Sequence, residues 1–187
     1  MKTINVVTVL GAAGTMGSNI SAIFASFGNA KVYMLDIEKS DKAVERAVKS
    51  VRAESIRKNL IPADYSMLEQ CIRESDLVFE SVVENIEIKK DVTQKASKWL
   101  KDGAYFCTGT SGLSINEISK VLPEAFRSKY FGIHFFNPPY SMTLCELIKT
   151  ELSKDEDVAF LNDYLTSRGC IGYRSKIHYG VRQRRRL

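Results

Sequence analysis

The sequence predicts an α/β fold of the Rossmann type: a doubly wound, mainly parallel sheet with helices on both faces. An apolar, β-branched run at residues 4–10 is typical of a strand buried on both faces of a parallel sheet. A glycine-rich turn follows this run and opens a helix. The next strand pattern then ends in an acidic residue, Asp36. Strand, glycine turn, helix and strand in this order form a βαβ unit.

Periodicity predicts the remaining elements in chain order. The first helix covers residues 16–27, with apolar residues spaced along one helix face, and the second strand covers residues 31–36. A long charged helix over residues 40–59 and a break at 61–64 are expected next. Further helices are expected at 65–73, 86–100, 114–121 and 154–167, and further strands at 76–81, 104–108, 130–136 and 143–149.

The glycine-rich turn predicts a dinucleotide site. Such a turn needs glycines so that the backbone can turn tightly, approach the pyrophosphate and pack its helix on the strand. The spacing is G-x-x-G-x-x-G rather than G-x-G-x-x-G, so either the turn is one residue wider or Ala12 tolerates the turn angle. A strand-to-helix turn without a ligand is the alternative. The residues expected to contact the cofactor are Gly11, Ala12, Gly14, Thr15, Met16 and Gly17.

Asp36 favours NAD over NADP. It closes the second predicted strand, where a carboxylate accepts hydrogen bonds from the adenosine ribose hydroxyls. The same carboxylate repels a 2′-phosphate, and the sequence places no arginine beside it. Asp36 could also cap the next helix.

His134 is the candidate base for a dehydrogenation. Removing hydride from an alcohol carbon requires a base that takes the hydroxyl proton. His134 ends a β-rich run just before Asn137-Pro138, which must leave the strand. Glu84 follows an earlier strand, and its loop should open on the same edge of the sheet. We expect Glu84 to hold the imidazole; a helix-dipole role is its alternative.

With these residues the chain resembles the 3-hydroxyacyl-CoA dehydrogenases, in their N-terminal NAD-binding domain. The resemblance covers about residues 4–149. It rests on four stretches, namely Gly-Thr-Met-Gly at 14–17, Val-Glu-Asn at 83–85, Thr-Ser-Gly-Leu-Ser at 110–114 and His-Phe-Phe-Asn-Pro at 134–138. It implies NAD-dependent oxidation of (S)-3-hydroxyacyl-CoA to 3-ketoacyl-CoA, in fatty acid metabolism such as β-oxidation.

The resemblance also implies roles for individual residues. His134 becomes the base and Glu84 its partner, while Ser111 hydrogen-bonds both substrate and cofactor. Lys89 and Asn137 match cofactor contacts of the family, as Glu84 and Ser111 also do. The nearest matches to its coenzyme A contacts are Ser50, Arg57 and Lys58, of which the two basic residues could equally solvate a helix face.

Two departures from the family pattern leave other functions open. The first glycine is displaced, and Gly109 stands where many members have asparagine. The family's all-helical domain, which closes over the acyl chain and forms the homodimer, would begin near residue 170, so full activity is not expected of this chain alone. A non-catalytic NAD-binding module is one alternative. A β-hydroxyacid dehydrogenase is another, although such enzymes typically use a lysine base.

Composition narrows the class of protein further. A chain of 187 residues that is 44% hydrophobic and 26% charged can form one globular domain. Neither a membrane span nor a leader is expected. Four widely spaced cysteines indicate free buried thiols in a reducing cytoplasm, and with two histidines no metal site is expected. The cysteines are Cys71, Cys107, Cys145 and Cys170.

Positive charge gathers at the end of the chain. All 22 acidic residues lie at or before Asp163, and seven of the 27 basic residues follow it, so residues 1–163 carry a net charge of −2. A basic nucleic-acid-binding face is therefore not expected. We expect an NAD-binding domain over residues 1–169 and a basic, disordered or non-native tail over residues 170–187. A functional basic arm is the alternative.

Overall fold

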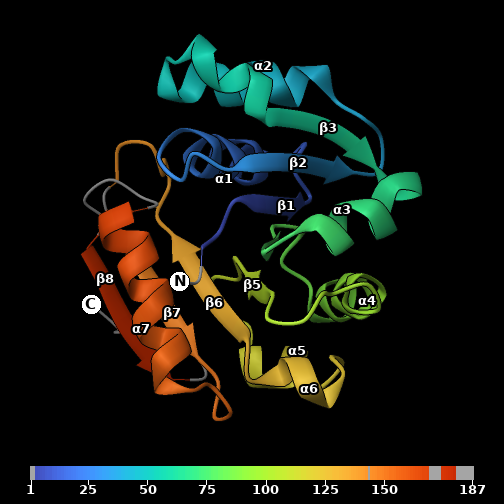
Figure 1. Ribbon diagram of the computed structural model, residues 1–187, viewed down its shortest axis with the longest axis vertical. Coiled ribbons are helices and arrows are strands. Elements are labelled where there is room, and N and C mark those ends of the chain that lie inside the picture. Colours follow the sequence, from blue (N-terminus) through green and yellow to red (C-terminus); the bar gives the residue numbers. More distant parts are fainter. Residues whose placement is uncertain (1–2, 143, 169–173, 180–187) are drawn as a thin grey trace.

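The strands of the described residues form a single eight-stranded sheet in the order β3-β2-β1-β4-β5-β6-β7-β8 (Figure 1). The computed structural model describes residues 3–142, 144–168 and 174–179. Neighbouring strands are parallel except β6 and β7, which are antiparallel. The strands are β1 (Val6–Leu10), β2 (Lys31–Asp36), β3 (Leu60–Asp64), β4 (Leu77–Glu80), β5 (Tyr105–Thr108), β6 (Tyr130–Phe135), β7 (Leu144–Lys149) and β8 (Arg174–Tyr179).

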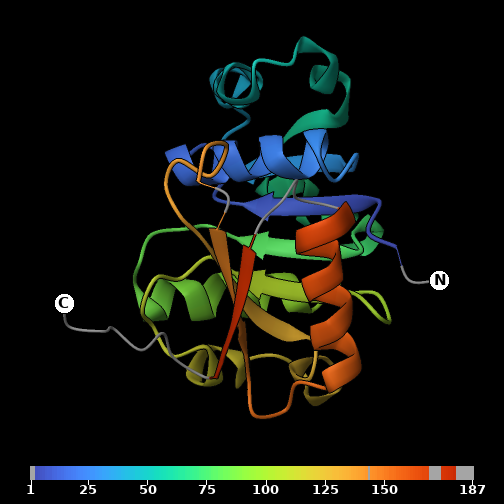
Figure 2. The same cartoon turned by 90° about the vertical axis from the view of Figure 1, so that its left-hand side faces the viewer.

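Helices cover both faces of this sheet, as the sequence predicts. Figure 2 shows α1 and α7 in front of the strands, and in Figure 1 α3 and α4 lie on the opposite side. The α-helices are α1 (Thr15–Ser26), α2 (Asp41–Val51), α3 (Leu68–Glu74), α4 (Ile86–Ser97), α5 (Ile115–Ser119), α6 (Glu124–Arg127) and α7 (Asp155–Asp163). Shorter turns are the 3-10 helices η1 (Glu54–Asn59) and η2 (Tyr65–Met67) and the π-helix η3 (Tyr164–Arg168).

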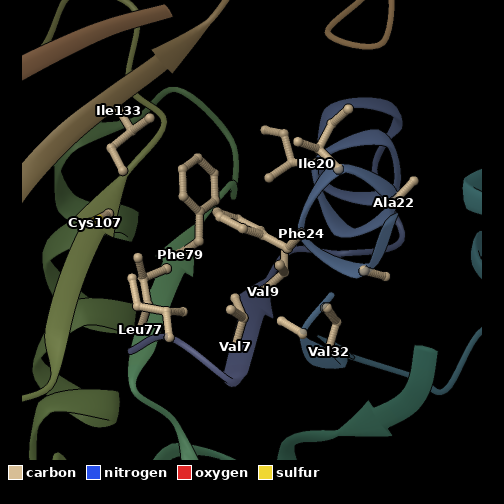
Figure 3. Packing of buried hydrophobic residues seen from close by; sticks show 14 of the residues in the cluster. Val7, Val9, Ile20, Ala22, Phe24, Val32, Leu77, Phe79, Cys107 and Ile133 are labelled. Carbon is tan, nitrogen blue, oxygen red and sulfur yellow. The ribbon is translucent and has the colours of Figure 1, made fainter. Parts of the chain in front are cut away.

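Each face of the sheet has its own hydrophobic core. On β1, Val7 and Val9 point to the face that α1 covers, while Leu10 belongs to the core of the other face. Figure 3 shows Phe24 of α1 packed between the sheet and the helix, close to Phe79 of β4. Their ring centroids are 5.9 Å apart in an edge-to-face arrangement. The apolar run of β1 is therefore buried on both sides, which is why it does not alternate.

The chain reverses its direction of winding after β3. It runs from β1 outward through β2 to β3, and then returns to add β4 on the other side of β1. Ligands of such sheets bind outside the carboxyl ends of the strands at this switch point. The β1 and β4 ends are therefore where a site is expected.

Two expected elements differ from the structure. The helix expected over residues 40–59 stops at Val51, because Arg52 adopts a left-handed conformation with φ 53° and Ala53 is extended. The break expected at 61–64 is strand β3, which pairs with β2. Pro62 fits there because β3 is the edge strand, where a missing N–H leaves no ladder bond unmade.

Part of the end of the chain also differs from the disordered or non-native tail that the sequence predicts. Residues 174–179, inside the stretch expected to be disordered, form β8 and pair in parallel with β7. An open edge of β7 offers unpaired backbone groups to any extended segment, which accounts for the pairing. The remainder of the predicted tail, with Cys170, lies outside the described residues. No helix in the described part of the chain is long and apolar enough to cross a membrane.

Candidate cofactor and catalytic site

The spacing of the glycine-rich turn left open whether the turn is one residue wider or Ala12 adopts the turn angle, and the structure answers this. Gly11, directly after β1, has φ 79°, so the left-handed position falls on the glycine and not on Ala12. A Cβ added to Gly17 would lie 2.2 Å from the Gly11 carbonyl oxygen, so only glycine lets α1 pack this closely on the turn. The wider turn therefore keeps two of the three functions of a dinucleotide turn, the tight turn of the backbone and the close packing of its helix.

The turn leads into a helix that is open at its start. α1 begins at Thr15 after Gly14, and among the described residues no side chain caps it. Its first amides and the positive end of its dipole are therefore available to a phosphate. Thr15 and Gly14 are exposed, whereas Ala12 and Gly17 are buried, so any contact of the latter two with a ligand is through the backbone.

Asp36 is held against the turn. Its Oδ2 accepts the amide of Ala13 at 2.8 Å and its Oδ1 accepts the amide of Ile37 at 2.8 Å. Each oxygen keeps a lone pair for a ribose hydroxyl. The sequence places no arginine beside Asp36, but in the fold Arg46 of α2 donates to the Ala13 carbonyl at 2.9 Å. The turn is thus fixed from both sides.

A pocket of about 460 Å³ opens between the turn and the loop after β4. The pKa of Tyr65 in this pocket is raised, mainly by burial and to a lesser extent by the charge of Asp36. Its hydroxyl is therefore a neutral donor at neutral pH. Tyr65 comes from the segment after β3, and the sequence pattern gives no signal for it. The lining residues are Gly11, Ala13, Gly14, Asp36, Ile37, Tyr65, Ser81, Val82, Val83, Ile88 and Val92.

These residues fit a dinucleotide. The glycines allow close approach of a pyrophosphate, Asp36 offers a carboxylate at the end of β2, and Ile37 and Val83 present exposed apolar side chains to a flat ring. The pocket also lies at the switch point of the sheet, where the fold places ligands.

His134 lies near the carboxyl end of β6 and is 8% exposed. Its Nδ1 is 3.0 Å from Oε2 of Glu146 on β7. The two residues are direct partners in the antiparallel register of β6 and β7. When Nδ1 donates to the carboxylate, Nε2 is the ring atom left to accept a proton.

This pair corrects the expected one. Glu84 is expected to hold the imidazole, but the carboxylate that contacts Nδ1 is Glu146. Sequence reasoning missed Glu146 because a cross-strand partner depends on the register of two strands. The available signal is the acidic residue in the middle of an otherwise apolar strand, Leu-Cys-Glu-Leu-Ile at 144–148.

Glu84 instead organises the loop after β5. Its Oε1 accepts the Thr110 hydroxyl at 2.7 Å and the amides of Ser111 and Gly112 at 2.7 and 3.2 Å. Partial burial opposes its ionisation, but the Thr110 bond, the two amides and the charge of Lys89 together lower the pKa of Glu84. Glu84 is therefore an anion that fixes the backbone of Ser111.

Behind Glu84 lies a buried ion pair. Lys89 of α4 and Glu80 at the end of β4 have side chains that are 1% and 0% exposed, and Lys89 Nζ is 2.8 Å from Glu80 Oε1. Lys89 Nζ is also 3.4 Å from Glu84 Oε2. Sequence reasoning missed Glu80, whose signal is again a carboxylate inside an apolar strand.

The remaining predicted residues fall into two groups. Ser111 and Asn137 are exposed in the loops after β5 and β6, on the same edge of the sheet as His134. Ser50 lines a second hollow of about 360 Å³, together with Phe27, Val51, Arg52, Tyr140 and Ser141. Arg57 pairs with Glu45 and Glu54, so its charge is neutralised within the protein, while Lys58 is exposed.

Comparison with known proteins gives one consistent result. A family model described as "3-hydroxyacyl-CoA dehydrogenase, NAD binding domain" matches residues 6–172. The chain is 33% identical over 173 residues to the "Putative fatty acid oxidation complex trifunctional enzyme" of Rickettsia prowazekii, covering 86% of this chain and 24% of that protein. It is 30% identical over 179 residues to the mitochondrial hydroxyacyl-coenzyme A dehydrogenase of Rattus norvegicus, covering 87% of this chain and 56% of that protein. The chain therefore spans little more than half, or less, of the length of these relatives.

Solved structures agree. The 3-hydroxybutyryl-CoA dehydrogenase of Escherichia coli K12 superposes with a TM-score of 0.80 at 26% identity, covering 96% of this chain and 39% of that chain. The (S)-3-hydroxybutyryl-CoA dehydrogenase PaaH1 of Ralstonia eutropha superposes with a TM-score of 0.78 at 25% identity, covering 95% of this chain and 64% of that chain.

Proposed function

The chain belongs to the 3-hydroxyacyl-CoA dehydrogenase family, in its NAD-binding domain, and from that premise we propose that it takes part in NAD-dependent oxidation of (S)-3-hydroxyacyl-CoA to 3-ketoacyl-CoA. The observation that carries the proposal is the buried pair of His134 and Glu146, 3.0 Å apart. It lies at the edge of the sheet where the carboxyl ends of β1, β4 and β5 also lie.

His134 is the base in this proposal. Glu146 accepts a hydrogen bond from Nδ1–H, which keeps the ring in the tautomer whose Nε2 takes the proton of the substrate hydroxyl. As the imidazole becomes positively charged, the adjacent carboxylate stabilises it. When NAD is bound, it accepts the hydride that leaves C3 of the substrate, so the alcohol loses one hydride and one proton in total.

Ser111 is proposed to hold the substrate oxygen. Its backbone amide is fixed by Glu84 at 2.7 Å, which gives its exposed hydroxyl a defined position on the rim of the site. Asn137, in the loop that follows His134, is proposed to border the reacting end of the cofactor. Both loops follow strands whose carboxyl ends lie side by side in the sheet.

The coenzyme A part of the substrate is proposed to approach the hollow that Ser50 lines. Arg52 lies in that hollow and Lys58 is exposed nearby in the sequence, so positive side chains are available for the phosphates.

We place the protein in the cytoplasm; support comes from free buried thiols among the described cysteines, which suit a reducing compartment.

Acetoacetyl-CoA-dependent oxidation of NADH by the purified chain tests this function. The wild-type chain is expected to show less than full turnover, and this turnover is expected to fall at least about 100-fold in His134→Ala, because a general base contributes about 100-fold to 10,000-fold. NADH affinity, followed by the fluorescence of bound NADH, should be equal in the two. Turnover that His134→Ala leaves unchanged would remove the assigned base. NADH binding without turnover in either protein would favour a non-catalytic NAD-binding module.

A further inference from the structure

Two neighbouring strands, β2 and β3, both end in an aspartate at the cofactor edge of the sheet. Asp36 ends β2 and Asp64 ends β3, and the two residues are partners in the parallel register. The residues before them, Leu35 and Ala63, both belong to the core of the other face, so the two aspartates share the face that α1 covers. Since paired strands lie about 4.8 Å apart, Asp64 stands directly beside the carboxylate that would bind the adenosine ribose.

The charge of Asp36 is shared with two backbone amides. Its Oδ2 accepts the amide of Ala13 and its Oδ1 accepts that of Ile37, both at 2.8 Å. Amide dipoles that point at a carboxylate offset part of the negative charge that a second anion would meet. Asp36 alone therefore repels a phosphate on the ribose less strongly than a carboxylate without these donors would.

Asp64 is held in place by Ser66. Its Oδ1 accepts the Ser66 hydroxyl at 2.5 Å and the Ser66 amide at 2.9 Å. These two bonds, the hydroxyl first, lower the pKa of Asp64, so its side chain is an anion at neutral pH. The side chain is 28% exposed, so its charge also acts on groups in the adjacent solvent.

The other oxygen of Asp64 faces a lysine. Lys39 Nζ is 3.7 Å from Asp64 Oδ2, and Lys39 follows Asp36 by three residues in the chain. A lysine at this place could otherwise bind a phosphate on the ribose. Another cation at this edge, Arg46, donates to the Ala13 carbonyl at 2.9 Å. Asp64 thus adds a negative charge beside Asp36 and engages a nearby positive one.

We propose that Asp64 is a specificity-determining residue for the cofactor, which acts together with Asp36 to exclude the 2′-phosphate of NADP. It acts through its own charge and by keeping Lys39 in an ion pair. A phosphate monoester carries about −1.5 to −2 charges at pH 7, whereas the ribose hydroxyl of NAD carries none. The proposal rests on the NAD-binding part of the proposed function, and turnover is not needed to test it.

Comparing NADPH with NADH isolates the effect, because the two differ only in the 2′-phosphate. Asp64→Asn removes the charge and keeps an oxygen that can accept both bonds from Ser66. It should tighten NADPH binding about fivefold, the scale at which a unit charge and a phosphate about 8 Å apart interact in water, and leave NADH binding unchanged. Glu117→Gln removes one negative charge from an exposed pair with Lys120 and is the matched control, which should change neither affinity.

The contribution of Lys39 is measured by making Asp64→Asn in a Lys39→Gln background. In the wild-type background the substitution both removes a negative charge and releases a lysine for the phosphate. In the Lys39→Gln background it only removes the charge, so the gain in NADPH affinity should be smaller. Equal gains in the two backgrounds would overturn the role assigned to Lys39.

Binding is followed by the fluorescence of bound NADH and NADPH, with variants that circular dichroism shows to be folded. A ratio of the two dissociation constants that Asp64→Asn leaves unchanged would overturn the proposal, as would wild-type protein that binds NADPH as tightly as NADH. Asp64→Ser, whose hydroxyl can also accept the Ser66 amide, removes the charge in a second way should Asp64→Asn fold poorly, and the same gain is expected. Wild-type protein that binds neither nucleotide would overturn the cofactor assignment as well, whereas NADH binding without turnover would count against the catalytic assignment only.

Discussion

Replacing Glu146 with glutamine removes one buried negative charge beside His134 and keeps the side-chain volume. The two side chains are 10% and 11% exposed, with Oε2 and Nδ1 3.0 Å apart. At an effective dielectric constant of about 20, two unit charges at this distance interact by about 5.5 kcal/mol, which is an upper limit for the effect.

We therefore expect Glu146→Gln to make protonation of His134 less favourable, because the carboxylate 3.0 Å from Nδ1 that stabilises the protonated ring is lost. Imidazole NMR can follow this directly, since the chain has only two histidines and the other, His178, serves as an internal reference. The assay does not depend on turnover.

The same variant has a kinetic consequence. The rate of acetoacetyl-CoA reduction should fall by about 100-fold, because a general acid/base that is no longer oriented and stabilised loses most of its contribution. NADH affinity should stay as in the wild type, because Glu146 does not line the pocket beside the glycine turn. A His134 midpoint that does not move, or a rate within about threefold of the wild type, would refute the assignment of this pair.

Two further substitutions test the turn and a surface cluster. Gly17→Ala places a Cβ 2.2 Å from the Gly11 carbonyl oxygen, so it should cost about 1–3 kcal/mol of unfolding free energy and weaken NADH binding. Gly14→Ala, whose Cβ lies 3.4 Å from the same oxygen, is the control, and equal stability of the two in urea unfolding would contradict the packing argument. Hydrogen bonds from Lys31 and then from a tyrosine hydroxyl lower the pKa of Glu74 from 4.5 to about 2, so its contribution is present above about pH 4.5 and is lost as the pH falls towards 2. The stability difference between wild type and Glu74→Gln should accordingly be smaller at about pH 3 than at about pH 6 in urea unfolding, and an unchanged difference would contradict the ion pair.

The fold was predictable where the pattern of one segment decides its structure. The second strand has the expected bounds, residues 31–36, and the first helix differs by one residue at each end. The segment 40–59 was not predictable in this way, because its charged residues suit a helix throughout. The left-handed residue Arg52 and the pairing of β3 with β2 end it instead. The pairing of β3 with β2 depends on contacts that are distant in the sequence, whereas the amide of Arg52 bonds locally to the carbonyls of Val48 and Lys49.

The site residues also differ in whether one segment of sequence was enough to predict them. His134 and the glycine turn belong to short motifs that carry their own signal. Glu146 and Glu80 are single carboxylates in apolar strands, and their partners become known only when the strand register and the position of α4 are known. Tyr65 reaches the pocket from beyond β3, which the sequence pattern did not indicate as a strand.

Among the carboxylates at the carboxyl edge of the sheet, Glu80, Glu84 and Glu146 have different partners, which separate their effects. Glu80 faces Lys89, and Glu84 faces backbone amides and the same lysine, so the groups opposite them keep their charge throughout a reaction. Only Glu146 faces a group that changes its charge when a proton is taken up, His134. An interaction that is equal in ground and transition states alters binding, whereas one that strengthens in the transition state alters the rate. Removing the charge of Glu80 should therefore change NADH affinity and spare the His134 titration, and removing that of Glu146 should do the reverse. A variant set that moved both quantities together would mean that the two buried pairs act as one network.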